Sequence, residues 1–149
     1  MIAYNVLFIL TWLACSITTD IQDNYEKLTE EELNSAPLKT AESLADVMLT
    51  AQRKGSPHLL KESEATTAVR QEFTTERQLQ TYSAIRELFG DYQSLIFVEA
   101  YRTLTEPAYY IFRFRGNFER GNAQPEVRVV MNLNTQLAGF FIHPWQDSL

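Results

Sequence analysis

Four short runs rich in β-branched and aromatic residues occupy the last third of the chain, and they constrain its fold more than any other feature. They span about residues 93–104, 109–115, 127–133 and 137–143, and turn-forming residues separate them. Alternation of apolar and polar residues within a run is typical of a strand with two different faces. We therefore expect four consecutive antiparallel strands.

Both faces of the expected sheet carry apolar residues. Strict alternation in the first strand separates Leu95, Phe97, Glu99 and Tyr101 from Ile96, Val98 and Ala100. One face must pack on helices, and the other is too aromatic to be simply solvated. We expect this second face to line a cavity or to form a dimer interface.

Apolar residues at helical spacing precede the strands. The stripe of the first expected helix consists of Leu38, Ala41, Leu44, Ala45, Met48 and Ala51. A shorter helix is expected over residues 64–73, and a third runs from Thr74 as its N-cap to Gly90 as its end. The inward residues of this third helix are expected to be Leu79, Tyr82, Ile85, Leu88 and Phe89. Because the stripes are purely apolar and single, the helices can cover only one face of the sheet.

The N-terminal residues 1–19 carry no charge and are expected to form an export signal. Their apolar run, Val6–Ala14, has the length of a signal-peptide core and is short for a bilayer span. Two outcomes remain open. Cleavage at the small-x-small motif around Cys15 would release a secreted or periplasmic domain, whereas acylation of Cys15, as in a lipoprotein, would anchor the domain to a membrane.

The polar, acidic residues 20–36 are expected to form a linker, with a helical turn at the capping-box sequence Thr29–Glu32. Residues 37–149 then form one domain, a length that suits a single core.

Composition argues against several classes of function. The formal net charge of −6 gives no electrostatic attraction for nucleic acid. One cysteine and two histidines cannot supply a Cys-based or His-rich zinc site. The sequence also lacks a phosphate-binding loop, a dinucleotide fingerprint and a Gly-x-Ser-x-Gly elbow. We expect no metal and no cofactor.

Three stretches carry a resemblance to a known superfamily. They are residues 41–48 (Ala-Glu-Ser-Leu-Ala-Asp-Val-Met), the junction 89–94 (Phe-Gly-Asp-Tyr-Gln-Ser) and the closing hairpin 129–144, which contains Ala-Gly-Phe-Phe-Ile-His-Pro. Over residues 38–145 the chain resembles the cystatin-like and NTF2-like α+β cone, and more closely a group of exported bacterial domains of unknown function.

This resemblance implies N-terminal helices packed on a curled four-stranded antiparallel sheet, a pocket between sheet and helices, and often a dimer through the sheet. The shared residues are turn and core features, so they specify a fold and not an activity.

His143 is the strongest candidate for acid–base chemistry, because it ends a strand near the expected rim of the cone. A carboxylate partner would be needed, and we take Glu99 to be the only carboxylate inside a strand. Tyr101 would complete such a site.

The arginines of the sheet have two interpretations. Arg113, Arg115 and Arg128 lie on neighbouring strands and could bind a carboxylate or phosphate ligand. The simpler interpretation is a cross-strand ladder of ion pairs that includes Glu99. The residues that would contact a ligand are Tyr109, Arg113, Arg115 and Phe141.

Two functions follow from these patterns. The first is an exported, non-catalytic NTF2-like domain that binds a small apolar ligand or a protein partner and dimerises through its sheet. The second is a small cone-pocket enzyme, isomerase- or hydrolase-like, with a site centred on His143. An enzyme requires polar groups that converge in a cavity, whereas a binding domain does not.

Overall fold

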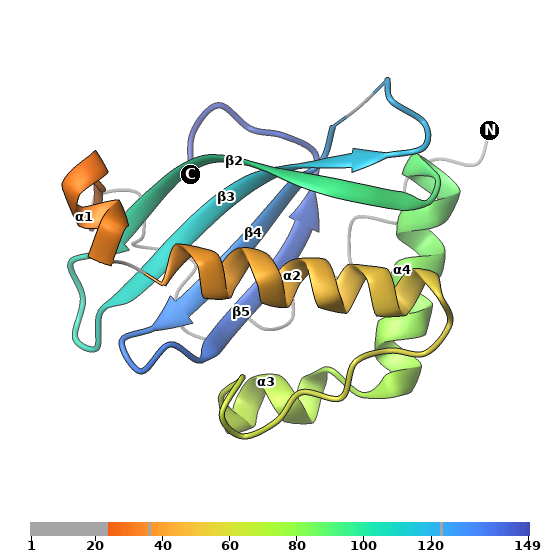
Figure 1. The fold of residues 1–149 in the computed structure, drawn as a ribbon, viewed down its shortest axis with the longest axis horizontal. Coiled ribbons are helices and arrows are strands. Elements are labelled where there is room, and N and C mark those ends of the chain that lie inside the picture. The colour runs from red at the N-terminus through yellow and green to blue at the C-terminus, as the bar shows by residue number, and fades with distance from the viewer. Residues whose placement is uncertain (1–23, 36, 123) are drawn as a thin grey trace.

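The computed structural model describes residues 24–35, 37–122 and 124–149. These residues form a curled, open, antiparallel sheet with helices packed on one face (Figure 1). The α+β class predicted from the sequence is confirmed. The elements in chain order are β1 (Tyr25–Lys27), α1 (Glu30–Ser35), α2 (Leu38–Arg53), α3 (Thr67–Glu72), α4 (Thr75–Phe89), β2 (Tyr92–Thr103), β3 (Tyr109–Phe118), β4 (Glu126–Asn132) and β5 (Leu137–His143). The expected signal at residues 1–19, including Cys15, lies outside the described residues.

The sheet has five strands in the order β1-β2-β3-β4-β5, so the prediction of four strands is wrong by one. The additional strand, β1, comes from the stretch expected to be a linker. It pairs with the end of β2, with Tyr25 opposite Thr103 and Lys27 opposite Tyr101. Three polar residues give no alternation signal, and only the pairing of their backbone with β2 defines them as a strand.

The predicted ends of the third helix are confirmed, whereas the second helix is shorter than predicted, Thr67–Glu72 in place of residues 64–73. The Thr74 hydroxyl accepts a hydrogen bond from the backbone N–H of Arg77 at 3.3 Å, and Gly90 ends α4 with φ of 80°. The capping box also forms at the start of α1, where the Glu32 carboxylate accepts from the Thr29 backbone N–H at 2.8 Å. Local side-chain chemistry therefore fixes where these helices begin and end.

The inward face of α4 agrees with the prediction for Tyr82 and Ile85 and differs at other positions. The buried residues are Gln78, Tyr82 and Ile85, while Leu79 and Leu88 are exposed. Gln78 can be buried because its amide donates to the backbone carbonyls of His58 and Phe73 and accepts from the Gln52 amide at 2.9 Å. The helix stripes are therefore not purely apolar, since a satisfied amide pair joins α2 to α4.

A register shift in β2 changes which residues share a face. Phe97 is opposite Phe114 and Glu99 is opposite Arg113, so Val98 is an extra residue in the pairing with β3. Strict alternation placed Phe97 and Glu99 on the same face, and this prediction is wrong. A bulge of one residue reverses the alternation beyond it, which turns Ala100 toward the helices and Glu99 away from them.

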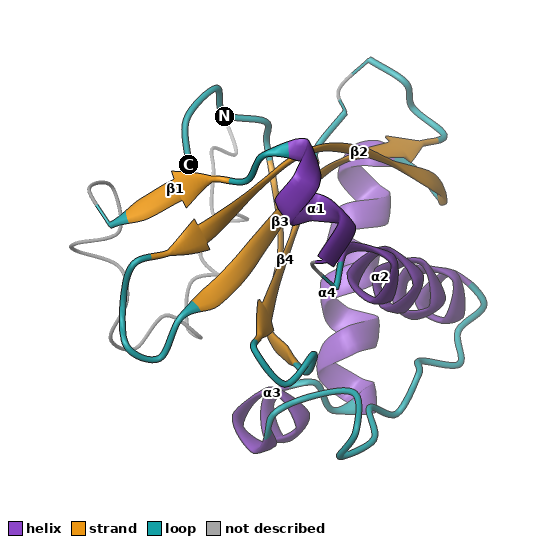
Figure 2. Ribbon diagram, turned by 60° about the vertical axis from the view of Figure 1, so that its left-hand side comes forward, coloured by secondary structure: helices purple, strands orange, loops and turns teal. Residues whose placement is uncertain are grey.

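The core lies between the helices and one face of the sheet. Met48 and Leu49 of α2 pack in one cluster with Phe112, Phe114 and other strand residues, and none of these four side chains is exposed. Figure 2 shows the helices together on one side of the sheet. In the described residues, no helix is long and apolar enough to cross a membrane.

Candidate functional site: an ion-pair ladder on the outer face

Polar side chains gather on the face of the sheet that points away from the helices, which we call the outer face. Glu99, Arg113 and Arg128 are opposite one another across β2, β3 and β4, and Glu126 is opposite His143 across β4 and β5. Directly opposite residues of antiparallel strands share a face. The bulge at residue 98 is what brings Glu99 into this group.

Arg113 is the centre of the group, and its side chain is fully buried. It donates from Nε to Glu126 Oε1 at 2.9 Å and from Nη2 to Glu126 Oε2 at 2.8 Å, which is a bidentate pair. It also donates from Nη1 to Glu99 Oε1 at 2.6 Å. A buried guanidinium is tolerated because carboxylates compensate its charge from two neighbouring strands.

Glu126 resolves a repulsion that the register creates. Arg113 and Arg128 are directly opposite each other, and two like charges in that position are destabilising. The Glu126 carboxylate accepts from both arginines, with Arg128 Nε at 2.7 Å from Oε1. One fully buried carboxylate thus forms ion pairs with both cations.

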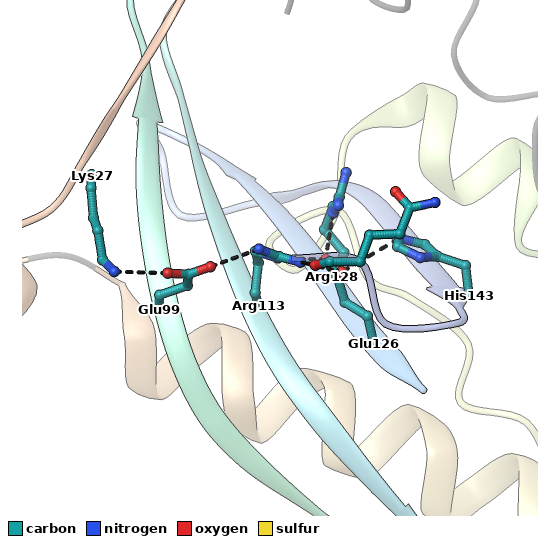
Figure 3. A network of polar contacts seen from close by, with 7 residues as sticks. Lys27, Glu99, Arg113, Glu126, Arg128 and His143 are labelled. Atoms are coloured by element: carbon teal, nitrogen blue, oxygen red, sulfur yellow. Dashed lines mark hydrogen bonds and ion pairs between the residues drawn. The ribbon is translucent and has the colours of Figure 1, made fainter. Parts of the chain in front are cut away.

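The ladder reaches the edge of the sheet through Lys27, whose Nζ lies 2.8 Å from Glu99 Oε2. Figure 3 shows Lys27, Glu99, Arg113, Glu126 and Arg128 as one continuous row of alternating charge. The predicted cross-strand ladder is therefore present for Arg113 and Glu99. Lys27 is 62% exposed and Arg113 not at all, so the ladder runs from solvent into the interior.

The electrostatics keep the ladder ionised. Burial by itself would raise the pKa of Glu126, but hydrogen bonds from Arg113 and Arg128 outweigh it and lower the pKa below its ordinary value. The pKa of Glu99 is lowered in the same way, against its burial, by Lys27, Tyr101 and Arg113. Burial opposes the charge of Arg113, yet its two carboxylate partners raise the pKa. The charged form of each of these groups is therefore stabilised by its oppositely charged neighbours in the ladder.

The C-terminal tail closes the ladder from outside. Trp145 lies against two arginines, with its ring centroid 4.4 Å from Arg113 Cζ and 4.0 Å from Arg115 Cζ. The backbone carbonyl of Gln146 accepts a hydrogen bond from Arg113 Nη2. The chain end lies on the side of the sheet opposite the helices (Figure 2). The tail therefore covers part of the outer face, for which the sequence had indicated a ligand or a second subunit.

His143 lies beside a carboxylate, but the partner is Glu126 and not Glu99. The distance from His143 Nε2 to Glu126 Oε2 is 3.9 Å, and His143 Nδ1 is 2.8 Å from the backbone oxygen of Pro144. Both ring nitrogens thus face acceptors of the same chain. A general base needs a nitrogen free to meet substrate, so this geometry favours a structural role for the ring.

The remaining candidates also lie on the outer face. Tyr109 and Phe141 are half-buried residues of β3 and β5, and Tyr101 of β2 is opposite Ile111. Burial, together with the Glu99 carboxylate, raises the pKa of Tyr101. None of Tyr109, Arg113, Arg115 and Phe141 faces the helices, so they cannot line a pocket between sheet and helices. The part of the chain that the structure describes contains no cluster of His, Cys, Asp and Glu residues able to hold a metal ion.

Sequence reasoning missed Glu126 and Trp145. Glu126 is the first residue of β4, so the prediction that Glu99 is the only carboxylate inside a strand is wrong. Its position two residues before Arg128 was a usable signal, because residues two apart in a strand share a face. The contact of Trp145 with the arginines had no local signal, since it depends on the tail folding back over β3.

No family model, curated protein or solved structure matches this chain.

Proposed function

We propose that this chain is an exported, non-catalytic domain of the NTF2-like/cystatin-like type, which binds a protein partner and dimerises through its sheet. The finer assignment of the fold is supported by the plan of the chain, with helices before a curled antiparallel meander. The packed interior favours a protein surface over a small apolar ligand as the binding partner.

One observation carries the proposal: the candidate ligand residues and the apolar interior lie on opposite faces of the sheet. Phe112, Phe114 and Met131 fill the space beneath the helices and are fully buried. Arg113, between the two phenylalanines in sequence, is fully engaged on the other face by Glu99 and Glu126. A domain built in this way would act through its surface and its edges.

The enzyme alternative has less support. It would require His143 to accept a proton from substrate, but its Nδ1 faces the Pro144 carbonyl and its Nε2 faces Glu126. The ladder carboxylates are held in their charged forms by Arg113, which suits a structural ion pair better than a proton donor.

Export can be tested on the chain with its own N-terminus. We expect a product that begins at or after Cys15 and is recovered outside the cytoplasm, and mass spectrometry of its N-terminal peptide separates the two outcomes. A free N-terminus after cleavage indicates a released domain, and an acylated Cys15 indicates a lipoprotein. Retention of Met1 in the recovered protein would contradict export.

Dimerisation can be tested on the same recovered protein. Sedimentation velocity across a range of concentrations should show a species of twice the chain mass, growing with concentration as mass action requires. A single species of monomer mass at every concentration would remove the dimer from the proposal.

A further inference from the structure

One edge of β2 has no strand against it over the first half of its length. Within the described residues, β3 pairs with β2 from Tyr92 to Arg102, while β1 reaches only Tyr101–Thr103 on the other side, extended by the Leu28 N–H bonded to the Ala100 carbonyl. Residues 93–98 therefore have no strand of the described chain paired with this edge. We call these six residues the free edge.

The free edge lacks most of the features that keep strand edges from pairing. Its sequence, Gln-Ser-Leu-Ile-Phe-Val, contains no charged residue and no proline. Two of its side chains are apolar and exposed, Ile96 by 49% and Val98 by 39%. Natural sheets protect such edges with lysine, proline, a bulge or a covering segment. The two register shifts of β2, at Gln93 and Val98, lie at the two ends of the free edge, and the residues between them pair regularly with β3. An edge of this kind is suited to accepting another strand.

Helix α2 runs beside this edge and carries a charge pattern that complements itself. A shallow groove of about 350 Å³ lies between them, lined by Lys39, Glu42, Ser43, Asp46, Ser94 and Leu95. The four helix residues form one stripe, because they are spaced by three and four positions. Lys39 and Asp46 stand at equal distances from the midpoint of the stripe. If the stripe is turned end to end against a copy of itself, Lys39 meets Asp46 and Glu42 meets Ser43.

We propose that two copies of this chain pair antiparallel through their free edges, about a two-fold axis that passes close to Ile96. The two sheets become one continuous sheet, the two α2 helices lie side by side, and each Lys39 faces Asp46 of the other copy. This inference rests on the dimerisation proposed above and names its surface. A two-fold axis requires a self-complementary patch, and both the neutral edge and the charge stripe meet that requirement.

The first test places a charge at the axis. Ile96→Lys brings two lysines together across the pairing, and we expect the dimer dissociation constant to rise by at least about tenfold. Leu133→Lys is the matched control, because Leu133 is also an exposed apolar residue, at 54%, but follows β4 at the other end of the sheet. The control should keep the wild-type dissociation constant. Both variants should keep the wild-type unfolding midpoint when it is measured at a concentration low enough for all three proteins to be monomeric.

The second test uses the charge stripe and remains decisive even if one variant is less stable. Lys39→Asp and Asp46→Lys should each weaken self-association, because each places like charges opposite each other. A mixture of the two variants restores both opposite-charge contacts, so the mixed dimer should form in preference to either homodimer. Asp46 also accepts a hydrogen bond from the Tyr92 hydroxyl at 2.6 Å, so the unfolding midpoint is measured alongside.

The outcomes separate the surface from the dimer. A dimer that is indifferent to Ile96→Lys, and variants that show no preference for the mixed dimer, would overturn the free-edge interface while leaving the proposed dimer intact. A protein that is monomeric at every concentration would overturn both. A monomer that binds an unrelated extended peptide in an Ile96-dependent way would assign the edge to another partner and overturn pairing between copies.

Discussion

Phe112 and Arg113 are adjacent in β3, and neither side chain is exposed, yet the two are buried in opposite ways. Phe112 lies among the apolar side chains beneath the helices. Arg113 lies on the outer face between Glu99 and Glu126, with Trp145 over it. The same degree of burial is reached by apolar packing on one face and by charge compensation on the other.

The two faces should therefore respond differently to perturbation. Apolar packing depends on volume and hardly on pH, whereas a buried ladder depends on every partner remaining charged. The difference between the faces can be measured by variants of single residues, and we expect their effects to decrease from the core outward along the ladder.

The largest loss is expected for Phe112→Ala. Removing a fully buried ring leaves a cavity, and such truncations cost about 3–5 kcal/mol of unfolding free energy. Urea unfolding at neutral pH measures it. Phe112→Leu is the matched control and should lose less than the alanine variant, because more of the volume is retained; equal losses would contradict the packing explanation.

A loss of about 3 kcal/mol is expected for Glu126→Gln, since removing one partner leaves buried cations uncompensated. The change keeps the shape of the side chain, so the effect isolates the charge. Asn117→Asp serves as a control on the same face, because Asn117 is a half-buried residue outside the ladder. If Glu126→Gln unfolds with the wild-type midpoint, the ladder does not stabilise the outer face.

The pH dependence of the unfolding free energy should also differ between the two faces. Glu99 and Glu126 have lowered pKa values in the folded protein, so their contribution is present above the ordinary pKa of 4.5. It is lost as pH falls through their folded pKa values, because protonation removes the partners of Arg113. Unfolding free energies measured from neutral pH to below about pH 4 should fall less steeply for Glu126→Gln than for the wild type. Phe112→Leu should keep the wild-type slope, and parallel curves for all three proteins would contradict this assignment.

A smaller loss, about 1–2 kcal/mol, is expected for Trp145→Ala, which removes the ring from two guanidinium groups. Trp145→Phe should retain part of it. If export removes residues 1–19, Trp145 is the only tryptophan left, so its fluorescence reports whether the tail is docked. A solvent-like emission spectrum in the folded wild type would show that the tail does not cover the outer face.

The smallest effect is expected for Lys27→Met at the exposed end of the ladder. Ion pairs in solvent gain little, and Lys27 is 62% exposed. We expect the denaturation midpoint to stay within experimental scatter of the wild type. A loss comparable to that of Glu126→Gln would show that the ladder acts as one cooperative network and not as a gradient from surface to core.

The sequence by itself determined the features that depend on neighbours in the chain. Thr74, Gly90 and the capping box at Thr29 act within one turn of a helix, and the helices end where these residues indicate. Alternation also predicted the α+β class and the last four strands, since β-branched and aromatic runs bounded by turns hardly depend on what they pack against. It even indicated a ladder between Arg113 and Glu99.

Only the tertiary structure decided the features that depend on register and on contacts between distant residues. The bulge at Val98 moved Glu99 to the outer face, and a single extra residue leaves no trace in composition or periodicity. β1 became a strand through the backbone of β2, and Gln78 entered the core because distant carbonyls satisfied its amide. The pairing of β3 with β4 places the Glu126 carboxylate beside Arg113. The C-terminal tail folds back over β3 and places the Trp145 ring against the same arginine. These interactions link residues far apart in sequence, so their energies exist only once the chain has folded.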